Sequence, residues 1–503
     1  MLADVKREDN TRAQRCNVEA FCGCKSLGKT AFGNNSLPVS KQKQSGCSVV
    51  MKFGGSILSK ESELRTLADV VKKRGKKEKI VIVASALKGI TDSLINAAGA
   101  CLESSEKIES NIAAIREKHF GIVEGIKDGK IRGNVEKALL KKFTLLERAL
   151  YGISYLKELS PRSLDLVQTL GERLSVLLLE AYLQDNGIDA VALDDACIVT
   201  NSNFGQGLPL MQETKEELGK RVGGILQKSI VILPGFFGTD KKGNIVSFGR
   251  GGSDFSAAII AAALEANALE LWKDVDGFMS ADPKIVNGAR LLSNLSYDEA
   301  EELGYFGAKI MYPKTVLPLR EKGIPIIVKN ILAPEKIGTV VSKEKHRHET
   351  IIKSIAVKRS IACVTLRSPA FVGQAGVLHK IFSAMANACV NVDLVTTSET
   401  GVSFTIDESD LQAAKEAVPS IDLVLEEVNF DKEVAMVGLV GEGLKRTAGV
   451  ASKVFNCLGK HGINAEMISS GSSEISLSFI IRESELEKTV KVLHDELRGH
   501  DLK

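Results

Sequence analysis

Residues 231–257, VILPGFFGTDKKGNIVSFGRGGSDFSA, decide how the rest of the chain is interpreted. The stretch begins as a buried strand followed by a hairpin. It ends in a glycine-rich elbow at residues 249–254, which opens into an alanine-rich helix at 255–264. Small residues let backbone N–H groups converge on an anion, and the helix N-terminus adds the positive end of its dipole. The stretch therefore predicts an anion-binding site, although a glycine-rich turn before a capped helix has the same pattern.

Two charged side chains of the elbow extend this prediction. Arg250 is suited to a bidentate grip on a carboxylate. Asp254 stands in the first helical turn, where it is either a capping carboxylate or the acceptor of an ammonium group. An arginine next to an aspartate favours an amino acid as the ligand.

The bulk composition limits the class of partner. The chain has 503 residues, and since about 100 to 200 residues per domain is usual, more than one domain is expected. Lys and Arg total 66 against 63 Asp and Glu, and this net charge of +3 calls for neither nucleic acid nor an anionic membrane. The sequence contains no run of 18 apolar residues, so we expect a soluble protein without a membrane span, whose partners are small molecules.

The cysteines and the N-terminal region bear on the cellular compartment of the protein and not on its catalytic residues. Nine cysteines without regular spacing predict reduced thiols in a cytoplasmic protein. Cys16, Cys22 and Cys24 lie close together, but no matching His or Cys pair follows, so no metal site is predicted. Residues 1–47 are polar and lack the apolar core of a secretory signal, which predicts disorder. A start codon assigned too far upstream is the alternative, because Met51 opens the first convincing strand.

From residue 48 onward short apolar strands alternate with helices. The expected strands are 49–53, 79–85, 190–193, 230–233, 269–272 and 324–329, the last clear strand of this half of the chain. The expected helices include 61–73, 112–119, 135–150, 164–183 and 298–306. This alternation predicts an α/β fold, with a mainly parallel sheet flanked by helices and ligands at the carboxyl ends of the strands.

The C-terminal part contains an internal repeat. Gly376-Val377 recurs as Gly449-Val450, an offset of 73, and Ser403-Phe404 recurs as Ser478-Phe479 after a gap of two residues. We therefore divide the chain into an N-terminal extension at 1–47, a catalytic domain at 48–342, a linker with the first regulatory strand at 343–356, and two small modules at 357–427 and 428–503. A duplication that only mediates dimerisation is the alternative interpretation of the repeat.

Lys52 ends the first strand, and Gly54 and Gly55 form the turn after it. Phosphoryl transfer depends on positioning and on neutralising charge, which a lysine and glycine amides can supply. The chain has neither the Gly-x-x-x-x-Gly-Lys-Ser/Thr loop nor the signature motifs of protein kinases.

Taken together, six motifs are specific for one family. They are KFGGS (52–56), SALKGIT (85–91), TLGERLS (169–175), GRGGSDFSA (249–257), WKDVDGFMSADP (272–283) and YFGAKIMYP (305–313). Their order resembles the aspartate kinases of the amino-acid kinase fold. The repeat, with NVDLVTTSE (391–399) and GINAEMISSGSSEISLSF (462–479), is similar to the paired, ferredoxin-like ACT domains of that family.

The resemblance implies ATP-dependent phosphorylation of the L-aspartate side chain, the first step of lysine, threonine and methionine biosynthesis. Lys52, Arg250 and Asp254 would be catalytic. The aspartate pocket would contain Ser85, Thr91, Glu172 and Arg250, although Glu172 also reads as a solvent-exposed partner of Arg173. The ATP site, with Mg²⁺ on the phosphates, would contain Lys52, Gly54, Gly55, Lys273, Asp274, Met279, Lys284 and Lys309. The departures Ser56, Met279, Lys284 and Tyr312 stand where the family commonly has Thr, Tyr, Arg and His.

The resemblance also implies feedback inhibition by lysine, threonine or both, across a homodimer or homotetramer formed through the ACT domains. The effector site would contain Gln374, Val377, Leu378, Asn391, Val392, Asp393, Ser398 and Glu399. Within it, Asp393 and Glu399 would receive the ammonium group of the effector. A fusion to homoserine dehydrogenase is not expected, because no dinucleotide-binding pattern follows the repeat. An amino-acid sensor built on an inactive kinase fold is the rival hypothesis.

Overall fold

The computed structural model describes residues 47–307, 310–344, 351–471 and 473–499. Nearly all of the predicted N-terminal extension lies outside these ranges, as do Lys309 and most of the charged segment at 343–348. None of the helices in the described ranges is both long enough and apolar enough to span a membrane.

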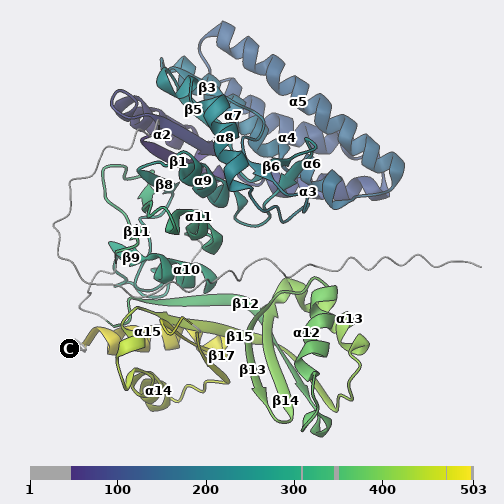
Figure 1. The fold of residues 1–503 in the computed structure, drawn as a ribbon, viewed down its shortest axis with the longest axis vertical. Coiled ribbons are helices and arrows are strands. Elements are labelled where there is room, and N and C mark those ends of the chain that lie inside the picture. The colour runs from purple at the N-terminus through teal and green to yellow at the C-terminus, as the bar shows by residue number, and fades with distance from the viewer. Residues whose placement is uncertain (1–46, 308–309, 345–350, 472, 500–503) are drawn as a thin grey trace, which may run out of the picture. The chain divides into compact units, whose positions relative to one another are not determined.

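An eight-stranded sheet forms the centre of the catalytic half (Figure 1). Its strands, in spatial order, are β3 (Ala190–Ala192), β5 (Ile230–Pro234), β2 (Ile80–Ala84), β1 (Val49–Phe53), β8 (Ala268–Lys273), β10 (Ile326–Asn330), β11 (Val340–Ser342) and β9 (Asn294–Ser296). The first six strands are mutually parallel, and only the β10–β11 pair is antiparallel. The predicted mainly parallel sheet is therefore confirmed.

Residues 324–329, the last clear strand predicted for this half, correspond to β10, but β10 is not its last strand. β11 follows and pairs with β10 and β9, and it has only three residues. A strand this short shows no period-2 alternation from which it could be recognised in the sequence.

Helices cover both faces of the sheet, as the alternating pattern predicts. One face packs against α1 (Gly55–Leu58), α2 (Glu61–Arg74), α3 (Ile90–Glu103), α4 (Ile108–Val123), α5 (Gly129–Leu156), α6 (Pro161–Gln168) and α7 (Leu170–Asp185). The other packs against α8 (Met211–Val222), α9 (Gly252–Ala263), α10 (Tyr297–Tyr305) and α11 (Leu317–Arg320). Alternate residues of each strand are buried in the two cores, so the direction of every strand side chain follows from its place in the alternation.

The single helix predicted at 164–183 is in fact two helices, α6 and α7, which meet at Thr169. The Thr169 hydroxyl donates to the backbone carbonyl of Asp165, 2.8 Å away, and bonding of this kind bends a helix. Each of the two helices places one carboxylate near the elbow, Asp165 in α6 and Glu172 in α7.

A small three-stranded sheet supports the glycine-rich elbow. It consists of β4 (Val199–Thr200), β6 (Phe237–Asp240) and β7 (Ile245–Ser247), with β6 and β7 joined as the predicted hairpin. The elbow begins two residues after β7 and leads directly into α9.

The regulatory half is one six-stranded sheet with helices against it (Figure 1). The strand order is β13 (Val392–Ser398), β14 (Gly401–Asp407), β12 (Ser354–Arg367), β15 (Glu427–Val440), β17 (Ser476–Arg482) and β16 (Met467–Ser470). Its helices are α12 (Val377–Asn387), α13 (Leu411–Ala417), α14 (Val450–Lys460) and α15 (Leu486–Gly499). β12 and β15 have 14 residues each and differ by the predicted offset of 73, as do α12 and α14.

The two central strands serve both modules. The second half of β12 pairs with β14 in the first module, while the second half of β15 pairs with β17 in the second. β12 and β15 pair with each other along their whole length. Each module therefore contains one half of both strands, and β15 runs across the division predicted between residues 427 and 428.

Candidate active site

Two lysines point toward α9 from neighbouring parallel strands. Lys52 in β1 is on the same face as Val50, and Lys273 ends β8 on the same face as Leu271, both of which are buried in the core that contains α9. Because β1 and β8 are parallel and in register, their carboxyl ends meet at one edge of the sheet. The fold thus brings both side chains to the first turn of α9.

Asp254 in that turn is the common partner of the two lysines. Its Oδ1 lies 2.6 Å from Lys52 Nζ, and its Oδ2 lies 3.1 Å from Lys273 Nζ. Burial disfavours the charged carboxylate, but Lys273 and Lys52 outweigh this effect and lower the pKa of Asp254 to about 2. Burial also lowers the pKa of Lys52, although Asp254 opposes that shift. Asp254 is therefore not the side-chain cap of α9. It accepts ammonium groups, the other role that its position suggested, and these belong to two lysines of the chain.

Glu172 in α7 is the second buried carboxylate of the site. Its side chain is 3% exposed, and burial raises its pKa to about 8, against hydrogen bonds from the Ala86 backbone and Ser253. The prediction of a solvent-exposed pair with Arg173 is wrong, because Arg173 Nε donates to the Asp194 carbonyl instead, at 3.0 Å. Glu172 Oε2 has no hydrogen-bond partner in the part of the chain that the structure describes, so one acceptor remains for a ligand.

The glycines after β1 bring the remaining predicted segments together. A side chain at Gly55 would overlap the backbone carbonyl of Ala86, and one at Gly171 would meet Ala86 Cβ at 2.7 Å. The β1–α1 turn, the segment after β2 and the start of α7 therefore pack closely around Ala86. Ser85 precedes this residue and Thr91 lies in the first turn of α3, both half-buried.

Close packing also shapes the elbow. Gly249 and Gly251 have φ values of 69° and 71°, a region that favours glycine. A side chain at Gly251 would overlap the ring of Tyr312, and one at Gly252 would meet Phe236 at 2.8 Å. Tyr312, one of the departures noted in the sequence, thus lies directly against the elbow.

Arg250 is not where its predicted role requires it. Its side chain is 83% exposed, and its Nη1 lies 3.7 Å from Asp407 Oδ2 at the end of β14. The elbow keeps glycine at both neighbouring positions but turns the guanidinium toward the regulatory sheet.

The other predicted ATP-site residues follow β8. Asp274 and Lys284 are exposed and Met279 is half-buried, with its carbonyl accepting the Ser354 hydroxyl at 2.7 Å. Gly54 precedes α1 close to the Lys52 ammonium group. Lys309 lies outside the described residues.

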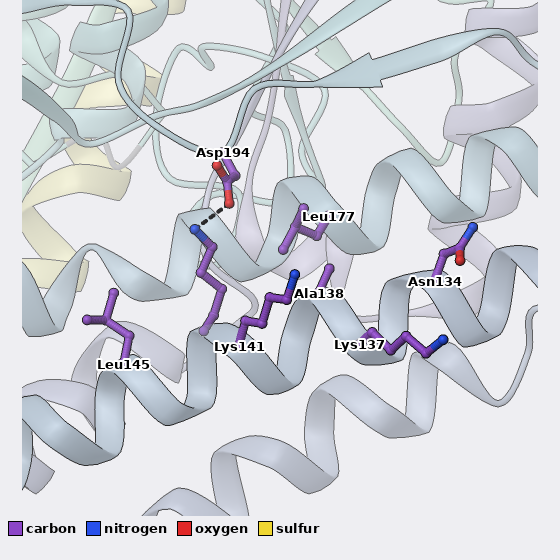
Figure 2. A pocket seen from close by; sticks show the side chains of 8 residues that line it. Asn134, Lys137, Ala138, Lys141, Leu145, Leu177 and Asp194 are labelled. Atoms are coloured by element: carbon purple, nitrogen blue, oxygen red, sulfur yellow. Dashed lines mark ion pairs between the residues drawn. The ribbon is translucent and has the colours of Figure 1, made fainter.

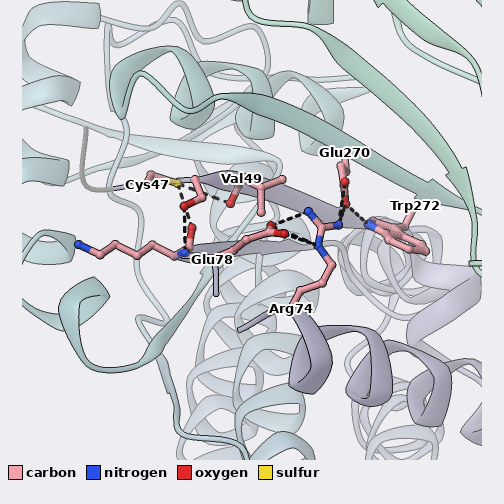
Figure 3. Close-up of polar contacts among 8 residues, drawn as sticks. Cys47, Val49, Arg74, Glu78, Glu270 and Trp272 are labelled. Carbon is pink, nitrogen blue, oxygen red and sulfur yellow. Dashed lines mark hydrogen bonds and ion pairs between the residues drawn. The ribbon is translucent and has the colours of Figure 1, made fainter. Parts of the chain in front are cut away.

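A buried polar network on the opposite face orients β8 (Figure 3). Glu270 is 4% exposed and accepts two bonds from Arg74 Nη1, at 2.7 and 2.8 Å, and one from Trp272 Nε1 at 3.1 Å. Arg74 also pairs with Glu78 at 2.6 Å, and the Trp272 ring stacks on Phe53. Because Glu270 and Trp272 are held on this face, the alternation of the strand directs Lys273 to the other.

A surface groove between α5 and α7 lies apart from these residues (Figure 2). Lys137, Lys141 and Lys142 line it with Asp194, which forms an ion pair with Lys142. The groove contains none of the predicted substrate or ATP residues.

One predicted effector residue of the first module, Asp393, belongs to an ion cluster that the sequence did not reveal. Lys358 in β12 pairs with Asp393 and, at 2.9 Å, with Asp407 Oδ1. Burial raises the pKa of Asp393, although Lys358 opposes the shift. Lys358 carries no local motif and lies 35 residues before Asp393, so the cluster follows only from the long-range pairing of β12 with β14 and of β14 with β13.

The other effector residues lie at the start of α12 and along β13. Val377 is buried, Val392 is half-buried, and Gln374, Leu378, Asn391, Ser398 and Glu399 are exposed. Asn391 Nδ2 lies 3.4 Å from Asp393 Oδ1.

Comparison with known proteins assigns both halves. A model of the amino acid kinase family matches residues 48–330, and an ACT-domain model matches residues 364–420 and 437–497. Aspartokinase 1, chloroplastic, of Arabidopsis thaliana is 33% identical over 470 residues, which cover 91% of this chain and 81% of that protein. The lysine-sensitive aspartokinase 3 of Escherichia coli is 32% identical over 456 residues, covering 89% of this chain and 99% of that protein.

The solved structures that resemble this chain are also aspartokinases. The R-state crystal structure of E. coli aspartokinase III in complex with aspartate and ADP matches with a TM-score of 0.78 at 29% identity, covering 90% of this chain and all of that one. The T-state structure of that enzyme with lysine and aspartate gives a TM-score of 0.77 at 28% identity, again covering 90% of this chain and 99% of that one. The family match spans more than half of the chain, and the relatives extend through both ACT matches. The chain therefore belongs to the amino acid kinase family and, within it, to the aspartokinases with C-terminal ACT domains.

Proposed function

We propose that the protein transfers the γ-phosphoryl group of ATP to the side-chain carboxylate of L-aspartate and forms 4-phospho-L-aspartate. The observation that carries this proposal is the buried Lys52–Asp254–Lys273 cluster at the carboxyl ends of β1 and β8. Asp254 holds both ammonium groups at one place, and phosphoryl transfer depends on such fixed positive charge.

The nucleophile needs no general base. The ordinary pKa of an aspartate side chain is about 3.9, so the substrate carboxylate is already ionised at neutral pH. Lys52 and Lys273 would neutralise charge that moves between the phosphoryl oxygens, while Asp254 keeps the lysines apart from each other and aligned. In-line placement of the two substrates supplies the rest of the acceleration.

Magnesium would enter with ATP. Asp254 is already paired with two lysines and Asp274 is exposed at the strand end, which fits an ion held mainly by phosphate oxygens and water. Bound there, the metal neutralises phosphate charge.

The aspartate pocket would use both buried and exposed groups. Glu172, with a free acceptor oxygen, suits the substrate ammonium group, and Ser85 and Thr91 offer hydroxyls nearby. Arg250 would bind a substrate carboxylate after leaving Asp407. The pair it leaves is exposed and 3.7 Å apart, so breaking it costs little.

Lysine is the effector that we propose for the ACT domains. One relative is named a lysine-sensitive aspartokinase, and a matching structure contains lysine. The Lys358 ammonium group between Asp393 and Asp407 marks a place in the first module that already accepts an ammonium group. Replacing Asp393 by Ala should weaken inhibition and spare basal activity. We expect a homodimer or homotetramer through the ACT domains, which analytical ultracentrifugation with and without lysine would measure.

The test is turnover of magnesium-ATP by the purified protein, with hydroxylamine trapping the acyl phosphate. L-Aspartate is compared with L-glutamate and N-acetylglutamate, each with and without lysine or threonine. We expect trapped product with aspartate alone, and inhibition by lysine. The absence of product with every acceptor, from protein that still binds lysine, would replace this proposal with an amino-acid sensor built on an inactive kinase fold.

A further inference from the structure

Asp165 in α6 is a buried carboxylate to which none of the motifs assigns a role. Its side chain is 1% exposed and accepts four hydrogen bonds. Oδ2 accepts the backbone N–H of Gly205 at 2.8 Å and that of Ser247 at 3.0 Å. Oδ1 accepts the Ser247 hydroxyl at 2.6 Å and the Gln168 amide at 2.7 Å. The two carboxylate oxygens thus accept two bonds each, from two different segments of the chain and from Gln168 of α6 itself.

The two segments that Asp165 holds are the ones behind the elbow. Ser247 is the last residue of β7, two residues before Gly249, and the Gly205 carbonyl lies 2.8 Å from where a Gly249 side chain would begin. A further bond runs from Gly207 N–H to the Ser247 carbonyl, at 2.8 Å. Asp165 therefore fixes the point from which the elbow departs.

The same carboxylate ties the elbow to the second part of the aspartate pocket. α6 runs into α7 through Thr169, and Glu172 lies in the first turn of α7. The chain thus has a short rigid connection from the Glu172 side of the pocket, through Asp165, to the elbow that carries Arg250 and Asp254.

We propose that Asp165 is a positioning residue for aspartate binding, which sets the elbow relative to Glu172 without touching either substrate. The proposal rests on the aspartate kinase function proposed above. Loss of Asp165 should affect aspartate binding more than ATP binding. The aspartate pocket depends on the distance between Glu172 and the elbow, which Asp165 fixes. The ATP side is joined to the elbow through Asp254, but its lysines are fixed by the ends of β1 and β8, so it is disturbed less.

Asp240 provides a matched control at the other end of the same hairpin. It is 5% exposed, and its Oδ1 accepts two backbone N–H groups, of Lys242 and Asn244, at 2.9 and 2.8 Å. Its Oδ2 accepts the Ser202 hydroxyl and the Asn244 amide, both at 2.9 Å. The two carboxylates therefore match in burial and in type of bond, but only Asp165 is next to the elbow.

The experiment measures KM for aspartate, KM for ATP and kcat for the variants D165A, D165N and D240A, together with the thermal midpoint of each. D165A should raise KM for aspartate about tenfold, because small displacements of a binding group are costly, and should change KM for ATP less than twofold. D165N keeps an acceptor for the two backbone N–H groups and should recover most of the loss. D240A should lower the midpoint about as much as D165A and leave both KM values unchanged.

Two outcomes would overturn the proposal. One is a rise in KM for aspartate that is as large in D240A as in D165A, and the other is an equal rise in KM for ATP. If D165A does not fold, the milder variant S247A, which removes only the hydroxyl donor, should show the same selective rise at about threefold. Wild-type protein without any aspartate turnover would refute the proposed function itself, and the parallel wild-type assay shows this before any variant is compared.

Discussion

At the scale of the residue, Glu172 is a buried acid whose ionisation changes on folding. Its pKa is about 8 in the folded protein against an ordinary value of 4.5. The folded state therefore binds a proton that the unfolded chain lacks between these values. The stability that this group contributes is present in full below about pH 4.5 and is lost as the pH rises through 8.

Replacing Glu172 by Gln should remove this dependence, because glutamine does not ionise. Urea unfolding at pH 6 and pH 9 would measure it: the wild type should lose more stability between the two pH values than Glu172→Gln does. Equal losses in both proteins would show that the Glu172 pKa is not raised by burial in solution. The variant should also bind aspartate more weakly: a substrate ammonium group would favour the ionised form of Glu172, whereas the amide accepts a hydrogen bond but cannot ionise to form an ion pair.

The two lysines on Asp254 lead to a second prediction at this scale. Lys52→Ala removes fixed positive charge from the phosphoryl group and should lower kcat about 100-fold or more. Lys142→Ala is the control, because Lys142 also pairs with an aspartate, Asp194, but lies in the groove between α5 and α7. Steady-state assays at saturating ATP should show normal kcat for the control. A Lys52→Ala enzyme with near-normal kcat would exclude this lysine from catalysis.

The sequence indicated which segments contain the candidate site residues, but it did not indicate which way each side chain points. Lys52 and Asp254 meet because a strand end and a helix start are both visible as local patterns. The second partner of Asp254 was not visible, since Lys273 reaches it only through the parallel pairing of β1 and β8. Arg250 shows the reverse case, in which a residue expected in the pocket is turned toward Asp407 by an interaction between halves of the chain.

At the scale of the element, the conformation of the elbow depends on glycine at position 251, where a side chain would overlap Tyr312. Gly251→Ala should destabilise the protein by about 1 to 3 kcal/mol for the left-handed backbone alone. The overlap of the new methyl group with Tyr312 adds to this cost and should raise KM for aspartate. Urea unfolding and aspartate kinetics would measure both effects.

Gly187→Ala separates the two contributions. Gly187 has the same φ of 71° at the end of α7, but a side chain there would meet nothing within 4 Å. It should show the backbone cost only, with normal kinetics. If Gly251→Ala is no worse than Gly187→Ala, the contact with Tyr312 does not shape the elbow.

The central strands and the helix after the elbow could be predicted because each has a local apolar pattern. The strands β1, β2, β5 and β8 read as short apolar runs, and α9 reads as an alanine-rich helix after three glycines. The sequence does not indicate the break at Thr169, since the apolar positions of α6 and α7 continue without a gap and the hydroxyl of Thr169 bonds within its own turn, to the Asp165 carbonyl. The apolar pattern of the sequence therefore predicts where helices and strands lie, but it does not predict an interruption within a continuous apolar pattern, such as the one at Thr169.

At the scale of the whole molecule, Asp407 connects the elbow to the regulatory ion cluster. It contacts Arg250 from the catalytic half and Lys358 within the first module. Asp407→Asn should free Arg250 for the substrate and lower KM for aspartate in the absence of effector. Because exposed ion pairs contribute about 0.2 to 1 kcal/mol, the change should not exceed about fivefold.

Asp422→Asn is the matched control for this prediction. Asp422 forms an exposed ion pair with Lys380 in the same module, 2.9 Å apart, without contact to the elbow. Aspartate kinetics without effector should be normal for this variant. An unchanged or higher KM in Asp407→Asn would mean that the pair with Arg250 does not oppose substrate binding.

The sequence reveals the repeat, but it does not reveal that the two modules share the strands β12 and β15. An offset of 73 relates β12 to β15 and α12 to α14, which shows two copies of one unit. Nothing in either copy says that its central strand is divided between two modules, because that follows from pairing over long sequence distances.

This sharing of β12 and β15 has a consequence for how the protein is synthesised. The ribosome completes the first half of β12 long before the second half of β15, its partner strand, has been made. Until then the nascent chain has an unpaired strand edge, which invites association with other chains. A premature stop codon between the two modules should therefore yield an insoluble product instead of an enzyme freed from feedback, and a cell would have to remove that product by proteolysis.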